Sequence, residues 1–324
     1  MTDKTIRWLF LIGCLLFPAR IAFSLETLII ALPSKAFQFA IFPIAQERGY
    51  MKEEGIDLQI AYMQTTVGIQ ALVAGSVQFS GSGSSALIAI AKGNAPLKTV
   101  LAVNDQVLQW VFVRPDIASL KELRGKKVAV TGVASIATSM FKQISPKYGL
   151  DGNKDVVFIA PAANNRVPAL LSGAVDSAIL GTEERYAALE HGMKELMYLG
   201  NEVKNSWGTV ATSDRFIKEQ PKLIAGFMRA LLKALRVVRQ DREGALAAIE
   251  KFSELQKPQA MRMYDDLIKT FTSNGIVDEE TQRNDLAIVR DVAKVTVDVP
   301  IQRAYDFSFA QQADQQLSQT GWRP

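Results

Sequence analysis

The sequence of 324 residues contains a single histidine, His191, and a single cysteine, Cys14. One histidine cannot supply a metal pair, and a Ser-His-Asp triad would have to recruit His191. That residue follows Glu190 where a helix is expected to end, so we interpret it as a surface residue near a helix C-terminus. Neither G-x-x-x-x-G-K-[ST] nor a helix-opening G-x-G-x-x-G occurs. These absences argue against most enzyme and nucleotide-binding classes, and we predict no catalytic residue, no metal site and no cofactor.

Long hydrophobic runs are absent except at the N-terminus. A basic segment precedes the apolar residues 8–17, which are too few to span a bilayer. Ala22 and Ser24 are the small residues of a cleavage site, so residues 1–24 are predicted to be a secretory signal peptide and the protein periplasmic. Because apolar residues continue past Cys14, we favour a free cysteine within the discarded signal over a lipid anchor. The mature chain would then have no cysteine and no disulfide.

Excess charge of one sign is also absent from the mature chain. Removing residues 1–24 takes three basic and one acidic residue from totals of 37 and 33, which leaves 34 and 32. No basic run is interleaved with aromatic residues. Nucleic acid is therefore excluded as a partner.

At 324 residues the chain is long for one hydrophobic core, and two lobes are expected. Short strands alternate with helices, which predicts an α/β fold with parallel sheets. The expected strands are residues 27–32, 56–62, 77–79, 97–103, 109–113, 126–130, 156–159, 175–180 and 195–199. One helix is expected over 42–54. After Ser213 the pattern is almost entirely helical.

The run from Ser80 to Ser85 stands between an expected strand and an expected helix. At such a junction the first backbone N–H groups of the helix lack intrahelical partners and carry the positive end of the helix dipole. Glycines let a ligand approach the backbone, and serines add hydroxyl donors. The run therefore indicates a cradle for a polar or anionic small molecule, or alternatively a capped turn with no ligand.

Five segments in order resemble one family, the periplasmic solute-binding proteins of nitrate, sulfonate and taurine ABC transporters. These segments are residues 47–56, 71–79, 84–93, 120–130 and 169–176. The resemblance implies a type 2 periplasmic binding protein: two lobes, each a mostly parallel sheet with helices on both faces, joined by two crossing segments. Lobe 1 would comprise residues 25–112 and 212–324, and lobe 2 residues 113–211.

The resemblance also implies a monomer that traps a small solute between its lobes and delivers it to a membrane permease with a cytoplasmic ATPase. Four loops would line the cleft. Their candidate binding residues are Ser34, Phe37, Gln38, Ser82, Gly83, Ser84, Ser85, Thr131, Ser135, Thr138, Asn164, Thr182 and Glu183. For the hydroxyl residues, helix capping without a ligand is the alternative.

The solute itself stays open between a sulfonate, nitrate, taurine and a pyrimidine-like compound. Lys35 and Arg166 are the candidate cations for an anionic solute, whereas Glu183 would repel one. Trp110 and Trp207 lie near the expected crossings, where they either wall the cleft or pack the hinge; of the two we favour packing.

Two other functions remain as alternatives. One is an enzyme on the same fold, similar to thiamine-pyrimidine synthases. Those enzymes use a histidine and an iron-binding cysteine cluster, which the mature chain lacks. The other is a ligand-sensing partner of a membrane receptor.

Overall fold

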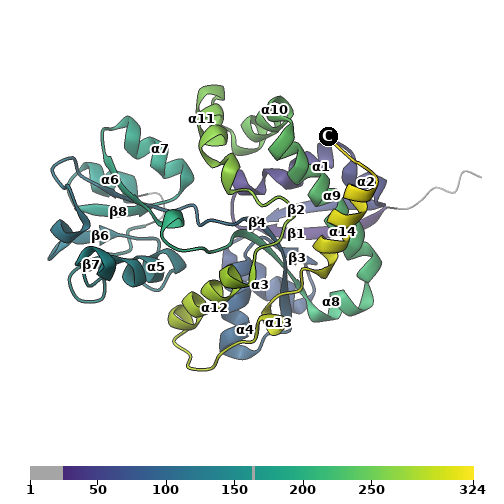
Figure 1. Ribbon diagram of the computed structural model, residues 1–324, viewed down its shortest axis with the longest axis horizontal. Helices are drawn as coiled ribbons and strands as arrows, with labels where there is room; N and C mark the ends of the chain where they lie inside the picture. Colours follow the sequence, from purple (N-terminus) through teal and green to yellow (C-terminus); the bar gives the residue numbers. More distant parts are fainter. Residues whose placement is uncertain (1–24, 163–164) are drawn as a thin grey trace, which may run out of the picture.

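The computed structural model describes residues 25–162 and 165–324 and shows two lobes side by side along the long axis of the molecule (Figure 1). The predicted signal peptide and Asn164 lie outside these residues. The first lobe is built on a five-stranded sheet of order β2-β1-β3-β10-β4. Its strands are β1 (Glu26–Leu32), β2 (Ile56–Tyr62), β3 (Phe79–Ser80), β4 (Leu97–Asn104) and β10 (Trp207–Ser213).

The second lobe repeats the arrangement with the order β7-β6-β8-β5-β9. Its strands are β5 (Trp110–Val113), β6 (Lys127–Ala129), β7 (Val157–Ile159), β8 (Ser177–Leu180) and β9 (Lys194–Tyr198). In each sheet the first three strands of the order are parallel and the fourth is antiparallel to both of its neighbours. The predicted α/β fold with two mostly parallel sheets is therefore confirmed.

The antiparallel strand of each sheet is the one that the chain forms after crossing from the other lobe. β5 pairs with β8 and β9, and β10 pairs with β3 and β4. Residues 110–112 and 207–211 therefore belong to the opposite sheets from those expected, because each crossing strand inserts into the sheet that it enters. We infer that the crossings lie at residues 105–109 and 199–206.

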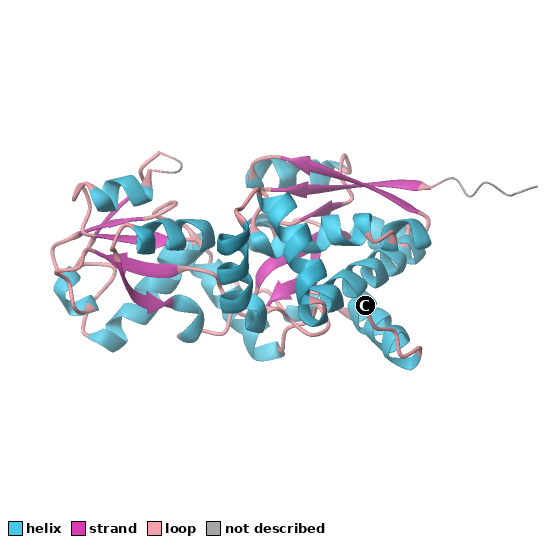
Figure 2. Cartoon of the chain, turned by 90° about the horizontal axis from the view of Figure 1, so that it is seen from above, coloured by secondary structure: helices cyan, strands magenta, loops and turns pink. Residues whose placement is uncertain are grey.

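Helices cover both sheets (Figure 2), and the first lobe also receives the C-terminal helices. In chain order, the first lobe has η1 (Phe37–Ala40), α1 (Ile41–Glu47), α2 (Tyr50–Glu53), α3 (Thr65–Ala74) and α4 (Gly83–Gly93). The second has η2 (Leu120–Leu123), α5 (Ile136–Ile144), η3 (Ser145–Tyr148), α6 (Arg166–Leu171), α7 (Thr182–Glu190) and η4 (Leu199–Asn201). The C-terminal elements are α8 (Asp214–Glu219), α9 (Pro221–Gln240), α10 (Arg242–Ser253), α11 (Lys257–Leu267), η5 (Ile268–Thr270), α12 (Glu279–Ala293), α13 (Ile301–Ala304) and α14 (Ser308–Gln319). Across residues 25–162 and 165–324, none of these helices combines the length and apolar character that a membrane span requires.

The helix expected over residues 42–54 is broken in two. Gly49 has a φ of 78°, in the left-handed region, and it separates α1 from α2. Glycine adopts this conformation without the steric cost that a Cβ brings, so it ends one helix and redirects the chain. The short helix α13 was not expected from the sequence.

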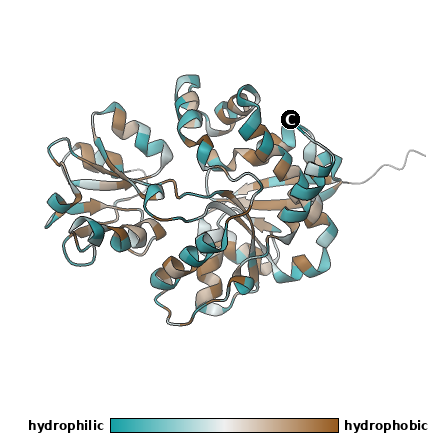
Figure 3. Ribbon diagram, in the orientation of Figure 1, coloured by the Kyte–Doolittle hydropathy of each residue, from teal (hydrophilic) through white to brown (hydrophobic). Residues whose placement is uncertain are grey.

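The core of the first lobe lies between its sheet and helix α9. Phe79 of β3 stacks on Phe227 of α9 with a ring-centroid distance of 4.0 Å, and both side chains are fully buried. The strands are accordingly apolar, whereas the outer faces of the helices are hydrophilic (Figure 3). Burial of this kind supplies most of the folding free energy.

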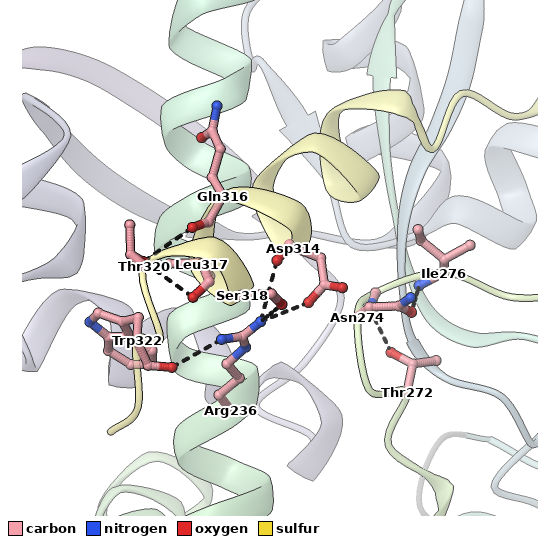
Figure 4. A network of polar contacts seen from close by, with 11 residues as sticks. Arg236, Thr272, Asn274, Ile276, Asp314, Gln316, Leu317, Ser318, Thr320 and Trp322 are labelled. Atoms are coloured by element: carbon pink, nitrogen blue, oxygen red, sulfur yellow. Dashed lines mark hydrogen bonds and ion pairs between the residues drawn. The ribbon is translucent and has the colours of Figure 1, made fainter.

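Arg236 of α9 forms hydrogen bonds and an ion pair with α14 and the residues that follow it (Figure 4). Its guanidinium donates to the Asp314 carboxylate at 2.9 Å, to the Ser318 hydroxyl at 3.0 Å and to the Trp322 carbonyl at 3.0 Å. The Arg236 side chain is largely buried, so these partners are needed to satisfy its charge. The C-terminal end of the chain is thereby part of the first lobe.

The second crossing segment is held by a buried carboxylate, Asp285 of α12. This carboxylate accepts hydrogen bonds from the Ser206 N–H at 3.0 Å, the Ser206 hydroxyl at 2.5 Å, the Tyr305 hydroxyl at 2.8 Å and the Asn205 amide. Burial raises the pKa of Asp285 to about 7, an effect that the hydrogen bonds from Ser206 and Tyr305 only partly oppose.

We expect Asp285 to make the protein less stable as pH rises from about 4 to 7. Folded, this carboxyl keeps its proton up to about pH 7, whereas in the unfolded chain it releases it near pH 4. The folded state therefore binds more protons in this window, and the free energy of unfolding falls with pH, by up to about 4 kcal/mol. Urea titrations of the wild type and Asp285→Asn at several pH values measure the difference. Parallel pH profiles for the two proteins would contradict the prediction.

Candidate functional site

The loops that follow β1, β2 and β3 in the first lobe meet the loop that follows β6 in the second. All four loops leave the C-terminal ends of parallel strands, where ligands of α/β sheets bind. Between the lobes they enclose a cavity of about 480 Å³, a size suited to a small organic solute. It is lined by Pro33, Ser34, Gln38, Phe39, Thr65, Gly81, Ser82, Gly83, Ser84, Ser85, Ile88, Gln109, Thr131, Ala134, Ser135, Ile136, Ala137, Trp207, Gly208 and Thr209.

The Ser80–Ser85 run forms the start of α4 and one wall of the cavity. Ser82 is the N-cap of the helix, and its carbonyl accepts from the N–H groups of Ser85 at 2.9 Å and Ala86 at 3.1 Å. Among the described residues, the N–H groups of Gly83 and Ser84 have no hydrogen-bond partner. Donors at the positive end of a helix thus face the cavity, as the sequence predicts.

The start of α5 forms the facing wall in the second lobe. Ser135 is its N-cap, and the Ser135 hydroxyl accepts from the Thr138 N–H at 3.3 Å. The Thr138 hydroxyl donates to the Gly132 carbonyl at 2.8 Å, which fixes the loop that carries Thr131. Ser135 therefore both caps a helix and lines the cavity, so its two interpretations are compatible.

Eight of the predicted binding residues line this one cavity. They are Ser34, Gln38, Ser82, Gly83, Ser84, Ser85, Thr131 and Ser135. The structure brings them together from three segments between residues 34 and 135, because two different sheets present them.

Four other predicted residues are described but do not line the cavity. The Phe37 side chain is fully buried and packs edge-on against Phe271 at 5.3 Å, and Thr138 is also buried. Thr182 is buried at the start of α7. Asn164 lies outside the described residues.

Glu183, the fourth of these residues, lies at the interface between the lobes. It belongs to α7 of the second lobe, while the backbone N–H of Phe37 in the first lobe is close enough to affect it. Loss of solvation around the carboxyl raises the pKa of Glu183. Hydrogen bonds from the backbone N–H groups of Glu183 and Phe37 favour the charged form and partly oppose this shift. The residue as a whole is nevertheless exposed, so the enclosed part is the carboxyl end of the side chain.

No charged side chain lines the cavity within the described part of the chain. Lys35 is exposed and pairs with Glu254. Arg166 forms a two-pronged ion pair with Glu184 and donates to the Ile179 carbonyl at 3.0 Å. Both candidate cations are thus engaged elsewhere, and polarity in the cavity comes from neutral groups.

Two glutamine side chains are part of that neutral set. Gln38 and Gln109 are 8% and 9% exposed as whole residues, and neither side-chain amide has a hydrogen-bond partner among the described residues. Neither amide is among the fully enclosed unpaired polar atoms, so both open to the cavity, where a solute or water can bond to them. Gln109 was missed in the sequence because it directly precedes β5, whereas the predicted binding residues follow the C-terminal ends of strands or begin helices.

The first residues of β10 complete the cavity wall. Trp207 lines the cavity, which is the alternative to the favoured hinge packing, and Gly208 and Thr209 beside it were missed in the sequence. Trp110 does pack there: it is buried and stacks on Tyr198 at 4.9 Å. The sequence placed Trp207 on a returning segment, and only the insertion of β10 beside β3 turns that segment toward the cavity.

His191 lies away from the cavity. It is exposed at the C-cap of α7, as predicted, and its Nδ1 is 2.8 Å from the Ala187 carbonyl oxygen. Within residues 25–162 and 165–324, no three residues of the types His, Cys, Asp and Glu are grouped so that they could hold a metal ion.

The family described as NMT1/THI5 like matches residues 36–245, which is more than half of the sequence. The chain belongs to this family. A curated relative, the riboflavin-binding protein RibY of Chloroflexus aurantiacus, is 25% identical over 206 residues. That match covers 61% of this chain and spans 58% of the relative's length.

Solved structures with the same fold include periplasmic binding proteins. The sulfonate-binding protein SsuA of Methylobacillus flagellatus KT has a TM-score of 0.77 at 18% identity, over 93% of this chain and 97% of that one. The nitrate-binding protein NrtA of Synechocystis PCC 6803 has a TM-score of 0.68 at 13% identity, over 90% and 89%. The predicted resemblance to nitrate- and sulfonate-class binding proteins is confirmed.

An enzyme shares the fold as well. The desulfurization enzyme DSZB, in complex with biphenyl-2-sulfinic acid, has a TM-score of 0.69 at 13% identity, over 90% of this chain and 99% of that one. The fold alone therefore does not separate binding from catalysis.

We expect Gly83→Ala to destabilise the protein and Gly93→Ala, at the other end of α4, to leave it nearly unchanged. A Cβ at Gly83 would lie 2.6 Å from the Thr209 Cβ and 3.1 Å from its backbone carbon, whereas a Cβ at Gly93 meets nothing within 4 Å. Overpacking of this kind costs about 1–3 kcal/mol. Urea unfolding midpoints measure both variants. Equal midpoints would show that α4 and β10 do not pack as closely as described.

Proposed function

We propose that this protein is the extracytoplasmic solute-binding component of an ABC importer. The cavity between the lobes is the observation that carries this proposal. The N-terminal ends of α4 in the first lobe and α5 in the second both line it, so a solute bound there would contact both lobes. Two lobes joined by two crossings can close around such a solute by a hinge movement. Family membership and the shared fold with SsuA and NrtA support this function.

The lining favours a particular chemistry for the solute. The start of α4 offers free N–H groups and the hydroxyls of Ser84 and Ser85, which suit an acceptor-rich group such as a carbonyl, a nitrate or a sulfonate. Apolar side chains, Phe39, Ile88 and Trp207 among them, suit a hydrocarbon or aromatic portion. We infer a small amphipathic solute that is neutral or carries one negative charge.

The remaining parts of the proposal concern transport. A membrane permease and its cytoplasmic ATPase would receive the solute, and the protein would act as a periplasmic monomer after removal of residues 1–24. The enzyme alternative has less support, because the chain has no cysteine after Cys14 and His191 lies outside the cavity.

A thermal-shift screen tests the proposal directly. The panel is hexanesulfonate, taurine, sodium nitrate, riboflavin and 4-amino-5-hydroxymethyl-2-methylpyrimidine. A bound solute stabilises only the folded state, so we expect at least one compound to raise Tm by about 5 °C at roughly 100 times its Kd. Native mass spectrometry of gently purified protein would then show a one-to-one complex. A panel without any shift, together with a ligand-free mass, would contradict the proposed function.

Replacing Ser84 and Ser85 together with alanine should weaken binding of the compound that shifts Tm most. Two lost hydrogen bonds to a solute correspond to roughly a tenfold rise in Kd, measured by calorimetry. Ser76→Ala, at an exposed position in the same lobe, is the matched control. An unchanged Kd in the double variant would mean that the run only starts a helix.

A further inference from the structure

Helix α12 contacts the cavity-forming helices of both lobes. It packs against α4 of the first lobe and α5 of the second, and the first turns of these two helices line the cavity. Ser139 of α5 donates a hydrogen bond to Asp291 of α12. Figure 1 shows α12 beside the crossing between the lobes. Although α12 does not line the cavity itself, its contacts can fix the positions of the two helices that do.

The same helix holds the second crossing segment residue by residue. Lys204 pairs with Glu280 at 2.6 Å, and the Lys204 carbonyl accepts from the Asn284 amide at 3.0 Å. Asn205 and Ser206 both donate to Asp285. The chain continues from this segment directly into Trp207, Gly208 and Thr209, which line the cavity.

Asp285 is the buried centre of this attachment. Its side chain is 4% exposed, and all four hydrogen bonds that it accepts come from neutral groups. Among the described residues, no cation pairs with it. An ionised carboxylate at this position would be a buried charge without a counter-ion, which is costly.

The neutral carboxyl fits the same set of partners. One oxygen can accept from the N–H groups of Asn205 and Ser206, while the protonated oxygen donates to the hydroxyl of Ser206 or Tyr305 and accepts from the other. Hydroxyls can reverse their direction in this way, whereas N–H groups cannot. All four contacts of Asp285 are then kept without a buried charge.

We propose that Asp285 is a positioning residue for the solute cavity: with its proton it holds the Trp207–Thr209 wall in place, and loss of that proton loosens the wall. The proposal rests on the proposed function only in taking this cavity as the solute site. A shift of this wall would also reach the N-terminal end of α4, because Thr209 packs tightly against Gly83 there.

Burial places the loss of this proton near neutral pH, since the pKa of Asp285 is raised to about 7. Tyr305, on the C-terminal segment, is the other titratable group that meets Asp285. Burial raises the pKa of Tyr305 well above its usual value, so its hydroxyl stays protonated at neutral pH. The charges on neighbouring turns are paired with other groups: Lys204 with Asp278 and Glu280, Arg283 with Glu279, and Arg290 with Asp298.

Hydrogen–deuterium exchange of the ligand-free protein tests the proposal with no solute needed. The measured quantity is the protection of the peptide covering residues 205–209, corrected for the intrinsic rate at each pH between 5 and 8. We expect wild-type protection to fall at least tenfold as pH rises from 5 to 7, because opening lets the carboxyl ionise in water.

Four variants sharpen the test. Asp285→Asn imitates the protonated carboxyl and should keep the segment protected at every pH, whereas Asp285→Ala should leave it unprotected throughout. Asp291→Asn, on the same helix, should keep the wild-type pH profile. Tyr305→Phe removes a donor to the charged form, so its pH profile should level off about one pH unit higher.

The outcomes separate this proposal from the proposed function. A wild-type profile without pH dependence, or an Asp285→Asn profile that follows the wild type, would overturn the positioning role even if a solute binds. The expected profiles in a protein that shows no Tm shift with the panel and a ligand-free mass would leave the positioning of the Trp207–Thr209 wall standing and contradict the importer function. If Asp285→Ala does not fold, wild type and Asp285→Asn decide.

Discussion

The exchange of one strand between the lobes is the constraint on which the rest of the structure depends. β5 and β10 each enter a sheet whose other strands come from a different stretch of the chain, and each runs antiparallel between two neighbours. Because each sheet is completed by this strand, the crossings are anchored on both sides. The C-terminal ends of the parallel strands then face a common space, and the cavity follows from that arrangement.

The cavity achieves polarity without charged side chains. Helix starts, hydroxyls and amides supply it, while the available cations are used in pairs outside the cavity, such as Arg166 with Glu184. Neutral dipoles fixed by the backbone lose little on desolvation compared with a charged side chain. Such a wall can accept an anion or a neutral acceptor group, which is consistent with the different solutes named for relatives of this fold.

Sequence patterns predicted the features that depend on local chain direction. The bounds of β2 matched the expected strand, and the Ser80–Ser85 run lies at the start of α4 because small residues and glycines permit that junction. Ser84 and Ser135 were correctly predicted to line the cavity because each lies at the start of a helix. Gln109, Trp207 and Thr209 were not predictable in this way, because their place depends on pairing between segments about 100 residues apart. The prediction that Phe37 lines the cavity was wrong, since an aromatic residue near a strand end packs equally well into the core.

The strand exchange also orders the events of folding. All strands of the second sheet lie between residues 110 and 198, so this lobe can assemble as soon as that continuous stretch is available. The first sheet is complete only with β10, and its core only with α9, although its first strand begins at Glu26. A chain that folds from its N-terminus can pair β1 with β2 and β3 early, whereas β4 joins this sheet only through β10 and stays unpaired until the second lobe has been passed. Until then the apolar faces of these strands lack the cover that β10 and α9 give them in the folded protein.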